Sequence, residues 1–324
     1  MKRFKNILFV KEPTTGSEAA LERAVTLAQN NQARLTVIDV VEQLPPGFEA
    51  VPTGFTWRSL QQTIVEERRE QLEQFAAVAG KTIALDVRLF SGVPYLEIIR
   101  KVLRDQHDLV VKPADSGGAL KARLFGSTDL HLLRKCPAPI WLMKAPATAK
   151  LNKILAAVDI GHETEKGPRD ALSLQILELA GSLALAEFCE LHIVHAWEVV
   201  GENILRGGRG GLSGEEVDSY VEEERERHRR WVEQLFQEAT AQLSREAIDY
   251  IKPQVHLPKG WAKEVIPHLV RDIDADLLVM GTVARTGVPG FFMGNTAEMI
   301  INSVDCSLLA VKPDGFMTPV TLTG

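Results

Sequence analysis

Four glycines lie close together in residues 280–299, whose sequence is MGTVARTGVPGFFMGNTAEM. This stretch follows an apolar run and leads into an expected helix. Glycines leave backbone N–H groups open to an anion, and a loop that runs from a strand into a helix often binds phosphate. The same residues could instead form a turn and a helix cap, because Asn295 and Glu298 have the spacing of a capping box. The residues by themselves leave both interpretations open.

Two histidines are the first candidates for a metal site. His192 and His195 are three residues apart in an expected strand, so their side chains point to opposite faces and cannot share one metal ion by themselves. A metal site that adds Cys189 or His256 is an alternative. Histidines that are packed or hydrogen-bonded are the favoured interpretation, and no metal is expected.

Cys136 is the candidate for redox chemistry, because the neighbouring Arg134 and Lys135 could lower its pKa. The alternative is a small, semi-buried thiol. The chain contains no Gly-Lys-Ser/Thr phosphate loop, no G-x-G-x-x-G after either expected first strand, and no local signature of a Ser/His/Asp or Cys/His arrangement. These absences argue against the mainstream kinases, GTPases and nicotinamide enzymes, and no catalytic activity is expected.

The elements that position these residues occur twice in the chain, as an internal repeat. A shift of about 168 residues aligns residues 86–144 with residues 254–312 without a gap, and about eleven positions are identical. In both repeats, short runs rich in Val, Ile and Leu alternate with longer amphipathic stretches, which is typical of β-α units around a parallel sheet. Residues 144–152 contain Pro and small residues and are expected to join the repeats. The expected domains are residues 1–147 and 148–324.

Each repeat is expected to contain five strands and to form a doubly wound sheet of the α/β class. The expected strands are residues 6–10, 34–41, 84–90, 109–112 and 140–144, then 153–158, 191–196, 252–257, 277–280 and 308–312. A helix is expected at residues 94–106, where Pro94 suits the first turn, and a long charged helix at residues 215–243.

Composition limits the setting and the partners. The 324-residue chain has a formal net charge of −6, which argues against nucleic-acid binding, and it has no apolar run long enough to span a membrane. Its three cysteines suggest neither a disulfide framework nor a zinc site, and the apolar stretch near the N-terminus is too short for a signal peptide. A cytoplasmic location is expected.

The stretch ADLLVMGTVARTGVPGFFMGNTAEMI resembles the G-x2-G-x9-G-[ST] nucleotide motif of universal stress proteins. LAAVD and ALSLQILELAGSLA resemble the first β-α unit of that family, and the resemblance covers nearly the whole chain twice. It implies two tandem five-stranded parallel sheets with strand order 3-2-1-4-5, the universal stress protein or adenine nucleotide alpha hydrolase-like fold. It also implies a stress-response role, and some members of the family bind ATP.

The resemblance places the nucleotide in the second repeat, with Mg²⁺ accompanying ATP. Adenosine would contact the end of the first strand and the backbone at the end of the second, and the phosphates would contact the glycine loop and the following helix start. The residues carried over are Ala157, Val158, Asp159 and Ala196, then Met280, Gly281, Val283, Ala284, Gly294, Asn295, Thr296 and Ala297.

Both repeats depart from the motif. In the second repeat, Ala284 replaces its second glycine and Asn295 replaces its Ser or Thr. In the first repeat, Pro113 and Ser116 take the first two glycine positions and Glu12 replaces the strand-end aspartate. Because proline has no amide proton, the first repeat is expected to have lost nucleotide binding.

The leading hypothesis is a non-catalytic stress-response protein whose second domain binds ATP or AMP as a regulatory ligand. The two domains are expected to pack as an internal pseudo-dimer, with a homodimer as a further option, because the apolar edge strand PIWLM needs a cover. One alternative is a ligand carrier or protein-interaction module without nucleotide. Another is a slow ATP-hydrolysing or adenylyl-transferring enzyme that uses Arg285, Asp159 or Glu298.

Overall fold

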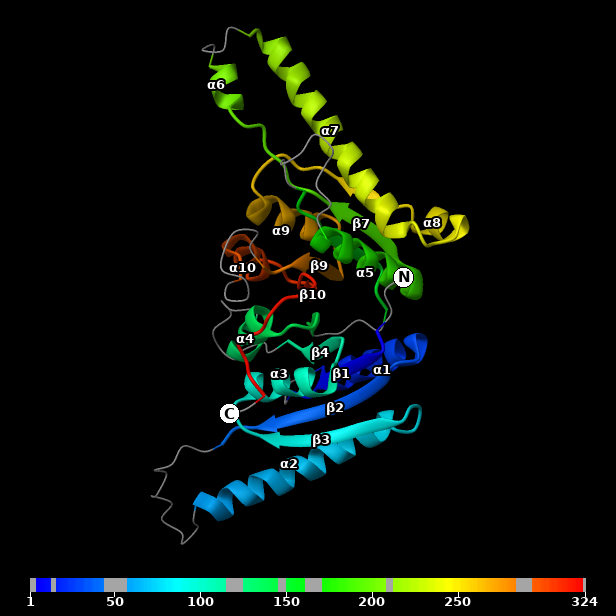
Figure 1. Ribbon diagram of the computed structural model, residues 1–324, viewed down its shortest axis with the longest axis vertical. Helices are drawn as coiled ribbons and strands as arrows, with labels where there is room; N and C mark the ends of the chain where they lie inside the picture. Colours follow the sequence, from blue (N-terminus) through cyan, green and yellow to red (C-terminus); the bar gives the residue numbers. More distant parts are fainter. Residues whose placement is uncertain are drawn as a thin grey trace. The chain divides into compact units, whose positions relative to one another are not determined.

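The computed structural model describes residues 4–12, 16–43, 57–114, 125–144, 150–160, 171–207, 212–283 and 293–322. Contacts between residues divide the chain into two compact units, shown with their elements in Figure 1. The first-repeat unit contains Arg3–Ala149, Thr282–Gly294 and Ser307–Gly324. The second-repeat unit contains Met1–Lys2, Lys150–Gly281 and Asn295–Cys306. The expected division between residues 147 and 148 follows the sequence repeats and stays a prediction. The compact units differ from it, because two late segments cluster with Arg3–Ala149.

The first-repeat unit is a sheet with strand order β3-β2-β1-β4-β5-β10. Its strands are β1 (Asn6–Val10), β2 (Arg34–Val41), β3 (Leu85–Ser91), β4 (Leu109–Pro113), β5 (Ile140–Met143) and β10 (Ser307–Val311). Its helices are α1 (Ser17–Asn31), α2 (Trp57–Ala79), α3 (Pro94–Asp105) and α4 (Ser127–Lys135). Helix α1 contacts α2 and α3 contacts α4, so each pair covers one face of the sheet.

The edge of this sheet departs from the expected parallel arrangement. Strands β1 to β5 are parallel and have the expected order 3-2-1-4-5, but β10 pairs with β5 antiparallel, with Leu309 opposite Trp141. The expected α/β class is confirmed, whereas the expectation of two tandem five-stranded sheets that are parallel throughout is corrected to a mixed sheet. The physical reason is the apolar edge of β5, all four of whose residues are buried beside β10.

The second-repeat unit carries four parallel strands in the order β9-β6-β7-β8. These are β6 (Lys153–Ala157), β7 (Glu190–Val194), β8 (Gln254–His256) and β9 (Leu277–Gly281). The helices are α5 (Ala171–Glu187), α6 (Glu202–Arg206), α7 (Gly214–Thr240), α8 (Arg245–Ile251), α9 (Ala262–Asp272) and α10 (Asn295–Ile301). Helix α5 packs against α7 and α8, and α9 packs against α10.

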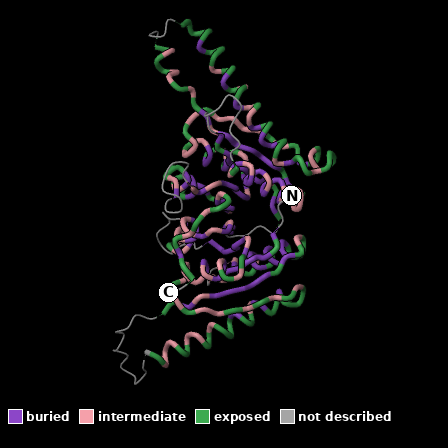
Figure 2. The backbone as a smooth tube through the Cα atoms, viewed as in Figure 1, coloured by how far each residue is buried: buried purple, intermediate pink, exposed green. Residues whose placement is uncertain are grey.

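Within each unit, the strands form the core. Figure 2 shows the strands largely buried and the helices exposed along one side, as expected for amphipathic helices that cover a sheet. The expected strands agree with the observed ones within about two residues at most ends, because continuous apolar runs mark strands buried on both faces. No helix of the described segments is long and apolar enough to cross a membrane.

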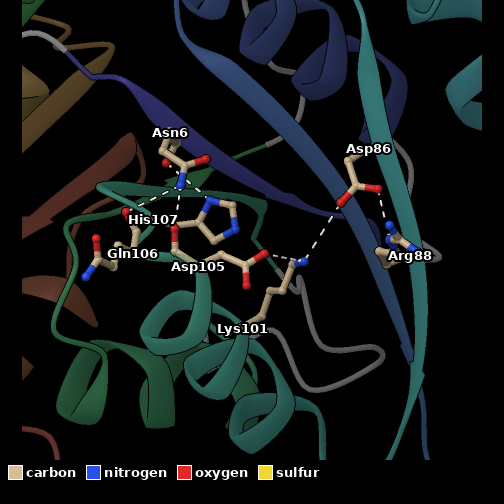
Figure 3. Close-up of polar contacts among 7 residues, drawn as sticks. All are labelled: Asn6, Asp86, Arg88, Lys101, Asp105, Gln106 and His107. Atoms are coloured by element: carbon tan, nitrogen blue, oxygen red, sulfur yellow. Dashed lines mark hydrogen bonds and ion pairs between the residues drawn. The ribbon is translucent and has the colours of Figure 1, made fainter.

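Polar contacts fix the amino end of β1 against the end of α3 (Figure 3). The Asn6 side-chain amide donates to the carbonyls of Asp105, at 2.7 Å, and Gln106, at 3.4 Å. Lys101 Nζ lies 2.6 Å from Asp105 Oδ2, and its hydrogen bond holds the pKa of that carboxyl below its ordinary value. Nδ1 of His107 lies 3.3 Å from the Asn6 carbonyl oxygen, and burial lowers the pKa of His107. These contacts lie at the amino ends of the strands of the first-repeat unit.

The repeated aspartates have a matching structural role. The carboxylate of Asp108 accepts the backbone N–H groups of Lys5, at 2.6 Å, and Asn6, at 3.0 Å. The carboxylate of Asp276 accepts those of Asn152, at 2.6 Å, and Lys153, at 3.0 Å. The identity of these two residues in the repeat alignment is thus explained by the same anchor at the start of each first strand.

Candidate functional site

The carboxyl ends of β6, β7 and β9 gather most of the expected site residues of the second-repeat unit. In parallel sheets, ligands bind at this edge, near the point where the strand order reverses. Ala157 at the end of β6 is the register partner of Met280 in β9 and of Val194 in β7. Ala157 and Met280 are both buried, so they form the floor beneath the strand ends.

Asp159 presents an exposed side chain just beyond this floor. Its backbone is fixed by Ser173 in the first turn of α5. The Ser173 hydroxyl lies 3.2 Å from the Asp159 nitrogen and 3.1 Å from the Asp159 carbonyl oxygen. The contact with the carbonyl oxygen has an equivalent in the first repeat, where the Ser17 hydroxyl donates to the Glu12 carbonyl at 2.6 Å. Sequence reasoning missed both serines, although each lies near the start of its helix.

The backbone of Val158 is held on both sides. Its N–H donates to the Val194 carbonyl at 3.0 Å, and its carbonyl oxygen lies 3.3 Å from Nδ1 of His195. The backbone of Ala196 is not held in this way. The N–H groups of its neighbours His195 and Trp197 donate to carbonyls in and just after β8, whereas the N–H and C=O of Ala196 have no hydrogen-bond partner among the described residues. Ala196 therefore offers one donor and one acceptor beside Val158.

Gly281 has a packing role that the sequence did not reveal. A Cβ atom at this position would lie 2.7 Å from Cδ2 and 3.3 Å from Cγ of Leu172 in α5. Real contacts of this kind are essentially never shorter than about 3 Å, so the missing side chain lets α5 approach the end of β9. The close approach explains Gly281 without a ligand.

The remaining site residues follow Gly281 in the chain. Val283 forms an isolated antiparallel bridge with Met293, and the N–H of Gly294 donates to the Thr282 carbonyl at 3.1 Å; these residues cluster with the first-repeat unit. Ala284 lies outside the described residues, as does Arg285.

Helix α10, in the second-repeat unit, begins with Asn295 and Thr296, which are exposed, followed by buried Ala297. Helix α10 is described from Asn295 onward, and the capping box expected from Asn295 and Glu298 stays a prediction.

Comparison with known proteins connects this geometry to a family. A sequence profile of the universal stress protein family matches residues 3–144 and again residues 150–312. The chain belongs to the universal stress protein family. Universal stress protein E of Salmonella typhi is 31% identical over 329 residues, covering 99% of this chain and 98% of that relative. The protein of the same name in Escherichia coli K12 is 30% identical over 327 residues, covering 99% and 98%. This protein is thus a universal stress protein of the tandem type, as its sequence predicts.

A solved structure supports the fold assignment of this universal stress protein. The crystal structure of a functionally unknown protein from Pseudomonas aeruginosa PAO1 matches it with a TM-score of 0.66 at 24% identity. The match covers 97% of this chain and 94% of the other. At that identity the likeness shows the α/β fold alone.

In the first repeat of this universal stress protein, an ion-pair cluster occupies the corresponding strand ends. Nζ of Lys112, at the end of β4, lies 2.8 Å from Glu12 Oε1 and 2.8 Å from Asp129 Oδ1, and the side chains of Lys112 and Asp129 are both 0% exposed. Burial acts to lower the pKa of Lys112, but the carboxylates of Asp129 and Glu12 outweigh it and raise that pKa. The expected loss of nucleotide binding in this repeat therefore gains a second physical reason.

The cluster could have been found from the repeat alignment. Lys112 and Asp129 align with Met280 and Ala297, so one repeat has a buried charge pair where the other has an apolar pair. A lysine at the end of the apolar run HDLVVK is the signal that sequence reasoning missed.

The histidines of the second-repeat unit form two separate pairs. Nδ1 of His192 lies 2.9 Å from Nε2 of His256, and Nε2 of His195 lies 2.8 Å from Nδ1 of His228 in α7. The expected opposite orientation of His192 and His195 is consistent with their separate partners. Within the described segments there is no group of three or more His, Cys, Asp or Glu residues that could hold a metal ion. His228 was not foreseen, because it lies in a highly charged helical stretch.

The burial of Cys136 decides between the two interpretations of this residue. The thiol is fully buried, and burial raises its pKa to about 12 despite the opposing effects of the Ala138 backbone hydrogen bond and the charge of Lys312. The desolvation of the thiolate therefore dominates over nearby positive charge. Such a thiol is a packed side chain and not a reactive one, which favours the alternative interpretation of Cys136.

Proposed function

We propose that the second repeat binds an adenine nucleotide, ATP or AMP, as a regulatory ligand, and that Mg²⁺ accompanies ATP. Two groups at the strand ends carry the proposal. One is the backbone of Ala196, whose N–H and C=O have no partner among the described residues, and the other is the exposed carboxylate of Asp159. An adenine edge offers a matching acceptor and donor, and a carboxylate suits ribose hydroxyl groups. Both lie at the strand ends where parallel sheets bind ligands.

The phosphate part of the site stays a prediction that rests on the family motif. Gly281, Val283, Ala284 and Gly294, followed by Asn295, Thr296 and Ala297, would line it. We infer that the protein senses or stores the nucleotide in the cytoplasm as part of a stress response and does not consume it. Protein partners that read the bound state belong to the same proposal.

Calorimetric titration with Mg-ATP and with AMP tests the proposal. We expect the native protein to bind one nucleotide, and Asp159→Ala to weaken binding about tenfold or more by removing a charged hydrogen-bond acceptor. Asp249→Ala is the matched control, since Asp249 is an exposed aspartate in α8 of the same unit. No heat with either nucleotide, and none released on denaturation of the purified protein, would contradict the proposal. Steady ATP turnover that Asp159→Ala abolishes would indicate an enzyme instead.

A cavity in the first-repeat unit favours a second candidate function, that of a ligand carrier. A cavity of about 790 Å³ lies between α1 and α2, within the size range of small-molecule sites. Its lining combines apolar Leu21, Val25 and Phe75 with the amides of Gln71 and Gln74. An apolar fluorescent dye tests this function. A protein that binds the dye but no nucleotide, and that loses the dye in Val25→Glu, would support a ligand carrier over a nucleotide-binding protein.

A further inference from the structure

A buried histidine bridge joins α7 to the strand end that carries Asp159. His195 follows β7 and is 2% exposed, whereas His228 lies in the middle of α7 and is 1% exposed. Their rings are joined by the 2.8 Å contact between Nε2 of His195 and Nδ1 of His228. The rings of Trp197 and Trp231 lie 5.3 and 4.9 Å from the His228 ring and help to enclose the pair.

The contacts of His195 define which of its nitrogens carries the proton. Nδ1 of His195 faces the Val158 carbonyl at 3.3 Å, and a carbonyl oxygen can only accept, so this nitrogen must carry hydrogen. In the neutral ring, Nε2 then has a lone pair and accepts from Nδ1–H of His228. The hydrogen bond from α7 therefore selects the tautomer that allows His195 to bind Val158.

This bond completes the fixation of the peptide group between Val158 and Asp159. The N–H side of Val158 is held by Val194, and the N–H of Asp159 is held by the Ser173 hydroxyl. The carbonyl oxygen of that peptide group is held by the His195 side chain. Loss of the last contact would leave this peptide group, from which the Asp159 side chain projects, held by its N–H alone.

We propose that His228 is a positioning residue for the nucleotide site, acting through the His195 ring to fix the Val158–Asp159 peptide group and thus the Asp159 carboxylate. This inference rests on the proposed nucleotide function of the second repeat. It also links the site to α7, the 27-residue helix whose first turns carry exposed charged side chains.

Three variants separate positioning from simple packing. His228→Leu removes the donor, whereas His228→Asn places an amide N–H where Nδ1–H lay. His256→Leu is the matched control, because it breaks the other histidine pair, in which the His256 ring bonds to His192. We expect His228→Leu to weaken binding of Mg-ATP about three- to tenfold, His228→Asn to recover most of the loss, and His256→Leu to bind as the native protein does.

Nuclear magnetic resonance supplies a readout that does not depend on nucleotide. In the native protein we expect His195 to show a protonated Nδ1 and an unprotonated Nε2. We expect His228→Leu to mix these tautomers and to shift the Asp159 amide resonance. His228→Asn should return that resonance to its native position. A protein in which these changes occur but which binds no nucleotide would retain the bridge and refute the proposed function.

Two results would overturn the positioning role. One is an unchanged His195 tautomer and Asp159 resonance in His228→Leu. The other is an unchanged nucleotide affinity in that variant, when the native protein binds nucleotide. If His228→Leu does not fold, His228→Phe replaces it, because an aromatic ring keeps the packing against Trp197 and Trp231 without a hydrogen-bond donor. The same two readouts apply to this variant.

Discussion

Single residues show how the two repeats have diverged at equivalent places. Glu12 and Asp159 both follow a first strand and both have their carbonyl bound by a helix serine. The side chain of Glu12, however, pairs with buried Lys112, whereas that of Asp159 is exposed. A buried lysine thus pairs with the strand-end carboxylate in one repeat, whereas the strand-end carboxylate of the other repeat reaches the surface.

The buried pair of Lys112 and Asp129 should show strong energetic coupling. Lys112→Met leaves Asp129 buried without its partner, so we expect the free energy of unfolding to fall by about 3–5 kcal/mol. The double variant with Asp129→Ala recreates the apolar pair Met280 and Ala297 of the other repeat, and should lose clearly less than the sum of the single changes. Urea unfolding of the four proteins measures this coupling.

The exposed pair of Arg225 and Glu222 in α7 is the control for this double-mutant comparison of Lys112 and Asp129. Its members lie in water, so we expect little coupling between Arg225→Met and Glu222→Ala. If the effects of Lys112→Met and Asp129→Ala on the free energy of unfolding add up, as they should for the control pair, then Lys112 and Asp129 do not depend on each other.

Lys312 predicts a rise of stability with pH. Its ammonium group is buried against the Leu133 carbonyl and the Thr282 hydroxyl, and burial lowers its pKa to about 8 from an ordinary value of 10.5. Between these values the unfolded chain binds more protons, so stability rises as pH increases. Cys136, with a pKa raised to about 12 from 9.0, has the opposite effect only above about pH 9.

The comparison of native protein with Lys312→Met isolates this effect. From pH 7 to pH 9, we expect urea unfolding to show the native protein gaining on the order of 1 kcal/mol relative to the variant. A difference that stays constant over this range would contradict the lowered pKa of Lys312.

At the scale of elements, close packing decides where glycine is needed. Strand β9 ends at Gly281 directly beside α5, and the strand can reach that point only because no Cβ meets Leu172. A glycine can be needed for close packing of a helix on a strand or for the approach of a ligand to the backbone. The glycine-rich sequence suggested a ligand, whereas the geometry of Gly281 shows close packing.

Gly281→Ala should therefore destabilise the second-repeat unit even without nucleotide. The added methyl group overlaps Leu172, and we expect a loss of about 1–3 kcal/mol, measured by thermal or urea unfolding. Leu172→Ala in the same chain should remove the penalty of the methyl group. Gly214→Ala is the control, because a Cβ there meets nothing within 4 Å and the residue begins α7. An equal effect at both glycines would disprove the packing explanation.

At the scale of the whole molecule, the sequence predicted the elements better than their assembly. Apolar runs located the strands, because a strand buried on both faces has few polar residues. The antiparallel pairing of β10 with β5 depends on contacts between distant segments, and no local pattern encodes such a choice. His228 was hidden for a related reason, since its partner His195 lies 33 residues away in the chain. Expected residues at the ends of β6 and β7 do lie together, as their strand-end positions predict.

The pairing of β10 with β5 predicts a long-range effect on stability. Leu309 in β10 is fully buried opposite Trp141, so Leu309→Ala should cost about 2–5 kcal/mol. Hydrogen exchange should reveal the loss first in Ile140–Met143 of the first-repeat unit. Leu278→Ala in β9 is the matched control and should affect β6 instead. Unchanged protection of β5 in Leu309→Ala would contradict the pairing.

The placement of β10 has a consequence for how the polypeptide can be divided. A cut between residues 144 and 150 would leave an N-terminal fragment without the strand that covers β5, and a C-terminal fragment that carries this strand. The two fragments would then be complementary, as the parts of a split reporter are. The boundary between the two repeats of the sequence is therefore a poor place to divide the protein, because the first-repeat unit takes its last strand from beyond that boundary.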